Sequence, residues 1–379
     1  MRIAIVTESF LPTLNGVTTS VCRVLDCLRA AGHDALVICP GPAPASYAGF
    51  PVHTVMGVTL RQFRVGLPSY GIEKILKDFR PDVVHAASPF GLGARGLAAA
   101  RNLRIPAVAI YQTDMPSYLK QHGGPAGGFV EKASWRWIRH MHTLADLTLV
   151  PSTQTLSELR GHGVPRTALW RRGVDTEMFD PARREESAVQ DLREMLAPAG
   201  ETIVGYVGRL APEKEVRRLA EVADLPGVSL CIVGDGPSRA SLERLLPKAS
   251  FLGYRSGLPL AQAYAALDVF AHTGTKETFG QTLQEAMAAG LPVVAPAAGG
   301  PLDIVKPGVT GLLFDPDHDG ALRQAVGGLV ADGSMRDRMG TAARAKVADR
   351  SWMSLVEELI AYYDTVISPS WSTRSPAAA

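Results

Sequence analysis

Short apolar runs alternate with helical patterns along the whole chain, and each run is rich in Val, Ile and Leu. Continuous runs of this kind are typical of parallel strands that are buried on both faces. Helices between such strands require right-handed crossovers, so the predicted fold class is α/β with doubly wound sheets. The predicted strands form two series: Ile3–Val6, Ala35–Cys39, Val83–His85, Ala107–Ile110 and Leu147–Val150, then Ile203–Val207, Ser229–Val233, Val269–Ala271, Val293–Ala295 and Leu312–Phe314.

The length of 379 residues and the two series of strands predict two domains. A charged segment with Gly and Pro at 170–191 indicates a linker, which divides an N-terminal domain, 1–172, from a C-terminal domain, 173–351. The amphipathic helix predicted at 352–367 is expected to pack back on the first domain. Residues 368–379 are rich in Pro and Ser and lack an apolar pattern, so a disordered tail is expected.

Composition places the chain among ordinary globular proteins, with 46% hydrophobic and 20% charged residues. The first apolar run is too short for a signal peptide, and no stretch approaches the ~20 apolar residues that cross a bilayer. We therefore expect a cytoplasmic protein. The four cysteines, Cys22, Cys27, Cys39 and Cys231, form no CxxC pair and are interpreted as structural thiols.

Charge is unevenly distributed along the chain, whose net charge is +2. Residues 1–170 hold 17 Lys/Arg and 10 Asp/Glu, a balance of +7, and the remainder holds 22 and 27, a balance of −5. The N-terminal part is thus the one expected to meet an anionic partner, although chance variation of the surface explains the imbalance equally well. We expect no nucleic-acid partner.

Two cations follow the first strand of the second series. The strand ends at Val207, Gly208 permits close approach of a ligand to the backbone, and Arg209 and Lys214 come next. An arginine fork and a lysine point charge are suited to a diphosphate. For this segment alone, a solvated surface pair is the better interpretation.

Two carboxylates, Glu277 and Glu285, lie eight residues apart later in the same predicted domain. If Gly280 opens a helix, the backbone amides of Gly280, Gln281 and Thr282 would meet phosphate or sugar oxygens at the positive end of the helix dipole. Carboxylates accept hydrogen bonds from sugar hydroxyls, but this spacing alone is a weak signal.

The cation segment precedes the carboxylate segment, and each follows a predicted strand. Together with other motifs, the two segments resemble those of a known family. The motifs Gly-Arg-Leu-x-x-x-Lys, Val-Gly-Asp-Gly-Pro and Glu-x7-Glu with Phe-Gly inside it stand at Gly208–Lys214, Val233–Pro237 and Glu277–Glu285. Leu291–Ala295 and Gly311–Phe314 also match. Over nearly its full length the chain resembles the retaining glycosyltransferases of the GT-B fold, family four. This resemblance implies two Rossmann-like domains that face a central cleft.

The resemblance also implies roles for residues of the donor domain. Arg209 and Lys214 would clamp the diphosphate of a nucleotide sugar, and Glu277 would contact a sugar hydroxyl. The Phe279–Gly280 backbone would assist, Glu285 would hold the ribose, and Tyr254 would lie against the base. The family implies retention, with the acceptor attacking on the face of the leaving group. No metal or other cofactor is predicted.

One position departs from the family pattern. The glycine that follows the motif lysine is Glu215 here. Its carboxylate adds a negative charge near the clamp, so we expect either weaker phosphate binding or a different loop.

Loops of the N-terminal domain supply the predicted acceptor side. In the family the loop at 8–17 faces the donor, which implies a donor contact at Gly16. Asp114 is predicted to orient an acceptor hydroxyl, with an N-cap as an equally good alternative. Gln112 stands where some relatives carry His, which argues against a His-based proton role there. Tyr118 is assigned to the same side.

His85 ends a predicted strand and is assigned to the acceptor side as well. A structural, hydrogen-bonded histidine is the somewhat better interpretation of this residue.

Two further motifs are interpreted as structural. Gly91–Gly96 fits GxGxxG but does not follow the first strand, which makes a nicotinamide enzyme a poor second hypothesis. Asp315–Asp317 resembles a metal motif of a different glycosyltransferase fold and is interpreted as a loop cap.

Residues 129–142 are predicted to form a helix with a basic face of Lys132, Arg136, Arg139 and His140. Val130, Trp137 and Met141 line another face. A basic face beside tryptophans is typical of a helix in a membrane interface, and packing of the aromatic face on the sheet is an equally good alternative. Membrane contact would place the protein on the inner face of the plasma membrane.

The opening residues 7–17 and Tyr111–Asp114 look most like actinobacterial mannosyltransferases that act on glycolipids. The resemblance therefore implies GDP-mannose as donor and a lipid-linked acceptor. A UDP-sugar donor is the alternative within the fold. A non-catalytic nucleotide-sugar sensor is the alternative from another class, and the intact set of Arg209, Lys214, Glu277 and Glu285 argues against it.

Overall fold

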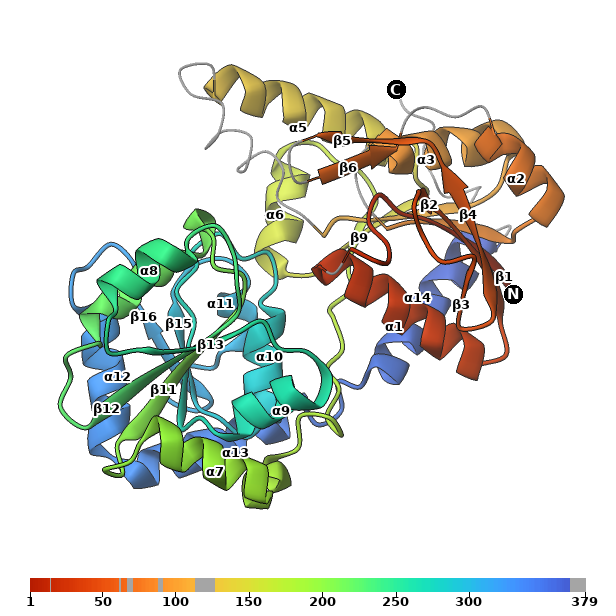
Figure 1. Ribbon diagram of the computed structural model, residues 1–379. Coiled ribbons are helices and arrows are strands. Elements are labelled where there is room, and N and C mark those ends of the chain that lie inside the picture. The colour runs from red at the N-terminus through yellow and green to blue at the C-terminus, as the bar shows by residue number, and fades with distance from the viewer. Residues whose placement is uncertain (14, 61–62, 67–70, 88–90, 113–126, 369–379) are drawn as a thin grey trace. The chain divides into compact units, whose positions relative to one another are not determined.

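The computed structural model describes residues 1–13, 15–60, 63–66, 71–87, 91–112 and 127–368 (Figure 1). The chain divides into two compact units. Unit 1 comprises Met1–Arg172 and the segment from Trp352 onward, and unit 2 comprises Gly173–Ser351.

Unit 1 is built on an eight-stranded sheet with the order β10-β9-β8-β7-β1-β2-β4-β3. All neighbours pair in parallel except β3 with β4. A separate antiparallel pair is formed by β5 and β6. The strands are β1 (Arg2–Val6), β2 (Asp34–Pro40), β3 (Ser46–Tyr47), β4 (Phe50–Val55), β5 (Gly57–Leu60), β6 (Phe63–Gly66), β7 (Val83–Ala86), β8 (Ala107–Ile110), β9 (Leu147–Val150) and β10 (Thr167–Leu169).

Helices cover both faces of this sheet because successive side chains of each strand point to opposite sides. Ile3 and Ile5 of β1 pack in a cluster with α1 and α14, whereas Ala4 and Val6 pack with α2 and α3. The described helices of unit 1 are α1 (Gly16–Ala30), α2 (Gly71–Phe79), α3 (Gly91–Leu103), α5 (Gly127–Thr143), α6 (Thr153–Gly161) and α14 (Trp352–Ile367).

The last helix, α14, belongs to unit 1 although it follows unit 2 in the sequence. Leu359 and Tyr363 are fully buried in the unit 1 core. The Trp170 indole donates to the Leu355 carbonyl at 2.8 Å, and the Tyr362 hydroxyl donates to the Leu169 carbonyl at 2.8 Å. Helix α14 thus helps to complete the core of unit 1.

Unit 2 holds a six-stranded, fully parallel sheet with the order β13-β12-β11-β14-β15-β16. Its strands are β11 (Thr202–Val207), β12 (Val228–Val233), β13 (Ser250–Gly253), β14 (Val269–Ala271), β15 (Val293–Pro296) and β16 (Gly311–Phe314). Its helices are α7 (Ser187–Leu196), α8 (Arg239–Leu245), α9 (Gly257–Ala265), α10 (Gln281–Ala288), α11 (Pro301–Ile304), α12 (Ala321–Ala331) and α13 (Gly333–Val347), with 3-10 turns at Pro181–Glu185, Pro212–Lys214 and Val216–Glu221. Here too, separate apolar clusters cover the two faces.

All ten predicted strands lie within observed strands, so the α/β prediction is confirmed. The strands that the pattern did not reveal lie at or near sheet edges or in the separate β5–β6 pair. Phe50–Val55 mixes buried and exposed positions, and Ser250–Gly253 is only half-buried along its length. Continuous apolar runs are a property of strands buried on both faces, and these strands are not.

The prediction of a linker at 170–191 is wrong in one respect, because most of this segment is folded into unit 2. Val174, Phe179 and Val189 are buried in the unit 2 core, and α7 begins inside the segment at Ser187. The charges that suggested a linker are used in ion pairs, such as that between Arg183 and Glu186 at 2.7 Å.

The two motifs interpreted as structural have local explanations. Gly91–Gly96 lies within α3, and a Cβ on Gly96 would stand 2.9 Å from a methyl group of Val6, so this glycine permits close packing of helix on strand. The Asp315 carboxylate accepts a hydrogen bond from the Asp317 amide at 3.0 Å, as expected of a loop cap.

Candidate active site

Two loops of unit 2 meet because the strands before them are neighbours. The cations follow β11, Glu277 follows β14, and these two strands pair in parallel. Carboxyl ends of parallel neighbours lie at the same edge of a sheet, which is where doubly wound proteins bind ligands. The Lys214 ammonium donates to Glu277 Oε2 at 2.7 Å, so residues 63 positions apart form one charged pair.

The backbone around Lys214 is held by the same neighbouring loop. Lys214 ends the 3-10 turn Pro212–Lys214, and its carbonyl accepts a hydrogen bond from the Thr273 hydroxyl at 2.7 Å. Thr273 is fully buried. The lysine is therefore fixed at its main chain while its side chain, 28% exposed, can turn toward a ligand.

Arg209 lies in the same loop as Lys214 but has a separate partner. Its guanidinium pairs with Glu213, four residues along the chain, and its side chain is 44% exposed. An exposed pair of this kind contributes little stability, so a diphosphate can compete for the guanidinium. Gly208, the residue before Arg209, packs closely against Tyr206. A Cβ added to Gly208 would stand 2.7 Å from the tyrosine hydroxyl.

The helix predicted to open at Gly280 does so. Gly280 has φ +102° and precedes α10, which begins at Gln281. Phe279 is buried at 2% exposure, which anchors the turn. The first amides of a helix have no acceptor within it, so those of Gln281 and Thr282 are available to an anion.

Glu285 and Tyr254 occupy positions compatible with their predicted roles, which stay predictions. Glu285 lies in the second turn of α10 and accepts a hydrogen bond from the Tyr264 hydroxyl at 2.9 Å. Burial, followed by the nearby Glu285 carboxylate, raises the pKa of Tyr264, so the phenol stays a donor. Tyr254 follows the edge strand β13 and is 59% exposed.

His272 lies next to the Lys214–Glu277 pair, and the sequence analysis did not predict it as a site residue. It follows β14, is 2% exposed, and its Nε2 lies 3.9 Å from Glu277 Oε2. Neither ring nitrogen has a hydrogen-bond partner within the described part of the chain. Burial lowers the pKa of His272 to about 4, so the imidazole is neutral near pH 7.

Glycines from two further loops pack closely against the backbone of the loops that carry the site residues. A Cβ on Gly234 would lie 1.9 Å from the Gly208 carbonyl oxygen, and one on Gly236 would lie 2.4 Å from that of Leu210. The Val-Gly-Asp-Gly-Pro motif is thus a platform for the cation loop. The sequence analysis did not predict the counterpart of this motif, Gly299 and Gly300, although a Gly-Gly pair shortly after a strand, here β15 ending at Pro296, was a usable signal.

The Gly299–Gly300 pair supports the carboxylate loop in the same way. An added Cβ would stand 2.5 Å from the Glu277 carbonyl oxygen at Gly299 and 2.2 Å from that of Phe279 at Gly300. The Gly300 amide also donates to the Glu277 carbonyl at 2.6 Å. The position of Glu277 therefore depends on the absence of side chains behind it.

The residues predicted for the acceptor side are brought together only in part. Gln112 is 7% exposed, donates to the Ala87 carbonyl at 2.8 Å and accepts from Arg172 at 2.6 Å. A second nitrogen of Arg172 reaches the Gly16 carbonyl at 3.5 Å, so Arg172, which was not predicted, links these two positions. Asp114 and Tyr118 lie outside the described residues.

His85 has the structural position that was the better of its two interpretations. It is 2% exposed, and its Nδ1 lies 2.5 Å from the Tyr363 hydroxyl of α14. Burial lowers the pKa of His85 to about 3. Because the imidazole is enclosed in the core and partnered there, the geometry gives it no access to an acceptor.

Helix α5 packs with a different set of residues from the one predicted. Its buried face consists of Trp135, Ile138, Met141 and His142, and Trp135 stacks on His162 with ring centroids 3.8 Å apart. Trp137, expected beside Met141, is instead 49% exposed. Lys132, Arg136, Arg139 and His140 are exposed too, so the aromatic residues divide between the core and the basic face.

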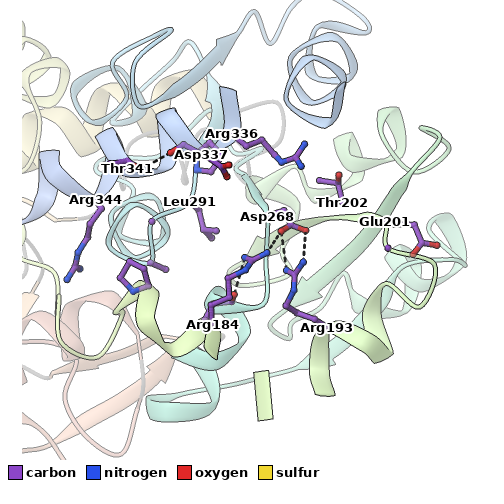
Figure 2. Close-up of a pocket in the computed structure, with 16 residues that line it drawn as sticks. Arg184, Arg193, Glu201, Thr202, Asp268, Leu291, Arg336, Asp337, Thr341 and Arg344 are labelled. Atoms are coloured by element: carbon purple, nitrogen blue, oxygen red, sulfur yellow. Dashed lines mark hydrogen bonds and ion pairs between the residues drawn. The ribbon is translucent and has the colours of Figure 1, made fainter. Parts of the chain in front are cut away.

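A pocket of about 730 Å³ lies at the other edge of the unit 2 sheet. Figure 2 shows Arg184 and Arg193 meeting Asp268, which directly precedes β14, with Thr202 at the start of β11 also in the lining. Arg193 lies 3.1 Å from Asp268, and the Ile203 amide donates to the same carboxylate at 2.8 Å. These arginines join α7 and the turn before it to the sheet, and the pocket is distinct from the candidate active site.

The described residues contain no group of three or more His, Cys, Asp or Glu side chains arranged to hold a metal ion. Within the same residues, every helix is too short or too polar to span a membrane.

Comparison with known proteins defines the class to which this fold and site belong. The family described as glycosyl transferases group 1 matches residues 190–346, and that described as glycosyltransferase family 4 matches residues 14–178. A solved structure of Anabaena HepE in complex with UDP aligns with a TM-score of 0.78 at 22% identity, covering 96% of this chain and 100% of that one. Sucrose-phosphate synthase from Thermosynechococcus elongatus aligns with a TM-score of 0.78 at 22% identity, covering 96% and 98%. The GT-B fold is therefore confirmed.

The chain belongs to glycosyltransferase family 4. It is 48% identical to the GDP-mannose-dependent alpha-mannosyltransferase of Mycolicibacterium smegmatis, with 97% of this chain and 98% of the relative covered. Identity to the enzyme of the same description from Mycobacterium tuberculosis is 47%, with 97% of each covered. The family prediction made from the motifs is confirmed.

Proposed function

We propose that this protein is a GDP-mannose-dependent α-mannosyltransferase that retains the configuration of the transferred sugar. The observation that carries the proposal is the Lys214–Glu277 pair, held at 2.7 Å at the carboxyl ends of neighbouring strands in a member of this family. The relatives that share nearly half of its residues over their whole length are described as GDP-mannose-dependent.

Each charged group of the site has a counterpart in a nucleotide sugar. Lys214 and Arg209 would bind the diphosphate and neutralise the charge that develops as it leaves, with the first amides of α10 as further donors. Glu277 would accept a hydrogen bond from a sugar hydroxyl. The bond from the sugar C1 to the phosphate oxygen breaks, the acceptor oxygen bonds to C1 on the same face, and the acceptor proton passes to the departing phosphate.

Glu277 and Glu213 neutralise the two cations until the diphosphate arrives. Lys214 pairs with Glu277, and Arg209 pairs with Glu213. Both pairs are partly exposed, so exchanging a carboxylate for a phosphate costs little desolvation. Donor binding would thus free Glu277 for the sugar at the moment when Lys214 turns to the diphosphate.

The base of the nucleotide is tested by calorimetry with GDP and UDP on the purified full-length protein. We expect tighter binding of GDP, and the Lys214→Ala variant should weaken it. Lys248→Ala, which removes an exposed lysine elsewhere in unit 2, is the matched control. Tighter binding of UDP would replace the mannose proposal by the UDP-sugar alternative.

The acceptor proposed here is lipid-linked, and the exposed face of α5 supports this. Arg136, Trp137, Arg139 and His140 present positive charge beside an exposed aromatic ring, which is suited to an anionic lipid surface. Within the described part of the chain, none of these three cations forms an ion pair with a carboxylate.

Co-sedimentation with vesicles of phosphatidylcholine and phosphatidylglycerol tests the α5 surface. The charge-reversed variant Arg136→Glu/Arg139→Glu should lose binding. The control Arg95→Glu/Arg101→Glu makes the same charge change on exposed positions of α3 and should retain it. Equal binding by both variants would remove α5 from the proposal.

A further inference from the structure

Glu215 has a backbone conformation that disfavours its own side chain. Its φ is +50° and its ψ is +31°, in the left-handed region, directly after Lys214. A residue with a Cβ in this region costs about 1 kcal/mol or more compared with glycine. Because a glycine would relieve that cost, the glutamate needs a compensating interaction.

The Glu215 carboxylate makes two interactions outside the clamp. One oxygen accepts a hydrogen bond from the Thr275 hydroxyl at 2.5 Å, and the other pairs with the Arg218 guanidinium at 2.7 Å. Burial acts to raise the pKa of Glu215, but the bonds from Thr275 and Arg218 outweigh it and lower the pKa. The Arg218 guanidinium thus offsets the negative charge that Glu215 adds directly after Lys214.

These contacts connect three loops at the carboxyl edge of the unit 2 sheet. Glu215 follows β11, and Thr275 lies between β14 and Glu277. Arg218 also donates to the Pro316 carbonyl, after β16, at 2.8 Å. Only Lys276 separates Thr275 from Glu277, and Glu215 directly follows Lys214. The bond between Glu215 and Thr275 therefore spans the same gap between loops as the Lys214–Glu277 pair.

We propose that Glu215 is a positioning residue that holds the loops of Lys214 and Glu277 in register while both side chains bind the donor. The inference rests on the proposed function of these two residues. The Lys214–Glu277 hydrogen bond must open when a diphosphate draws the lysine away. The Glu215–Thr275 bond then remains, together with the bond from Thr273 to the Lys214 carbonyl.

Three variants test this role: Glu215→Gly, Thr275→Val and the double variant. For each single variant we expect the donor KM to rise about tenfold. The double variant should be no worse than the more affected single one, because both remove the same bond. Glu215→Gln keeps an acceptor for the Thr275 hydroxyl, so its donor KM should lie between those of wild type and Glu215→Gly.

The melting temperature separates positioning from a purely structural role. In Glu215→Gly, relief of the backbone cost should offset much of the lost pairing, so Tm should change little while KM changes. Ala48→Gly is the matched control, because Ala48 has φ +50° in unit 1 and lies far from these loops in the sequence. It should leave KM unchanged.

A donor KM for Glu215→Gly within about twofold of wild type would overturn the inference, as would a lower Tm with unchanged KM. Failure of the proposed function gives a different result, which is a wild type that transfers sugar from no donor. In that case the dissociation constant of GDP or UDP, whichever the wild type binds, replaces KM. Equal nucleotide binding by wild type and Glu215→Gly would still contradict the inference.

Discussion

Lys214 and Glu277 are joined by a 2.7 Å hydrogen bond between two loops of unit 2, with side chains 28% and 18% exposed. Each partner offsets the cost of partly burying the other's charge. The pair forms because β11 and β14 are neighbours in the sheet, although 63 residues separate its members. The geometry of the candidate active site therefore follows from the strand order.

Removing the lysine should affect the chemical step most. We expect Lys214→Ala to lower kcat by about 100-fold or more, because a preorganised donor to a departing oxyanion is lost. Steady-state kinetics with saturating donor measure this, with Lys248→Ala as control. A kcat for Lys214→Ala close to that of wild type would exclude the lysine from stabilising the leaving group.

Adding a methyl group behind Glu277 should disturb the site without changing any charge. A Cβ on Gly300 would stand 2.2 Å from the Phe279 carbonyl oxygen, so Gly300→Ala must displace the carboxylate loop. We expect at least tenfold lower kcat/KM and a reduced Tm, with roughly 1–3 kcal/mol of lost stability as for an overpacked site. Gly328→Ala is the control, since nothing lies within 4 Å of its added Cβ in α12, and it should be neutral or stabilising. Equal activity of both variants would show that this glycine does not support Glu277.

Acid should destabilise the protein through three buried histidines. Burial lowers the pKa of His85 to about 3 and those of His142 and His272 to about 4. Unfolded histidine has a pKa near 6.5, so between about pH 6.5 and 4 the unfolded chain binds protons that the folded chain does not. Stability is then complete above pH 6.5 and is lost as the pH falls, by about 1.4 kcal/mol per pH unit for each histidine.

Proton uptake on unfolding at pH 5.5, from denaturant midpoints at closely spaced pH values, checks this expectation. We expect about three protons. Uptake below one proton would show that these imidazoles are already protonated in the folded protein.

Asp268 should matter for stability and not for transfer. It pairs with Arg184 and Arg193 (Figure 2). It also accepts a hydrogen bond from the Ile203 amide, at the edge of the sheet away from the candidate active site. Asp268→Ala should cost about 3 kcal/mol, the lower end for broken buried pairs because Arg184 is partly exposed. Asp337→Ala, in the same pocket but exposed, should cost under about 0.5 kcal/mol. Chemical denaturation with parallel kinetics measures both, and a selective loss of kcat in stable Asp268→Ala would contradict the structural assignment.

The sequence was sufficient to predict the inner strands and the start of the helix after Gly280, because both depend on local patterns. The apolar run Ile203–Val207 predicts a buried strand without further information, and Gly280 predicts the start of α10. Contacts between distant segments could not be predicted. The pairing of Glu215 with Thr275 and the enclosure of His85 by Tyr363 depend on which strands and helices become neighbours.

Helix α5 illustrates a second limit. Its pattern correctly indicated an amphipathic helix, but the choice between Trp135 and Trp137 for the buried face depends on His162, which stacks on Trp135 from a segment further along the chain. The charged segment at 170–191 was misjudged for a similar reason, since ion pairs within unit 2 satisfy its charges.

Sugar transfer from a donor panel tests the central claim most directly. Wild type and Lys214→Ala would be incubated with GDP-mannose, UDP-glucose and UDP-galactose and a membrane-lipid extract, and the lipid products would be digested with linkage-specific α- and β-mannosidases. We predict transfer from GDP-mannose to lipid, sensitivity of the product to α-mannosidase, and loss of transfer in the variant. Preferred transfer from a UDP-sugar, or a β-linked product, would contradict the account.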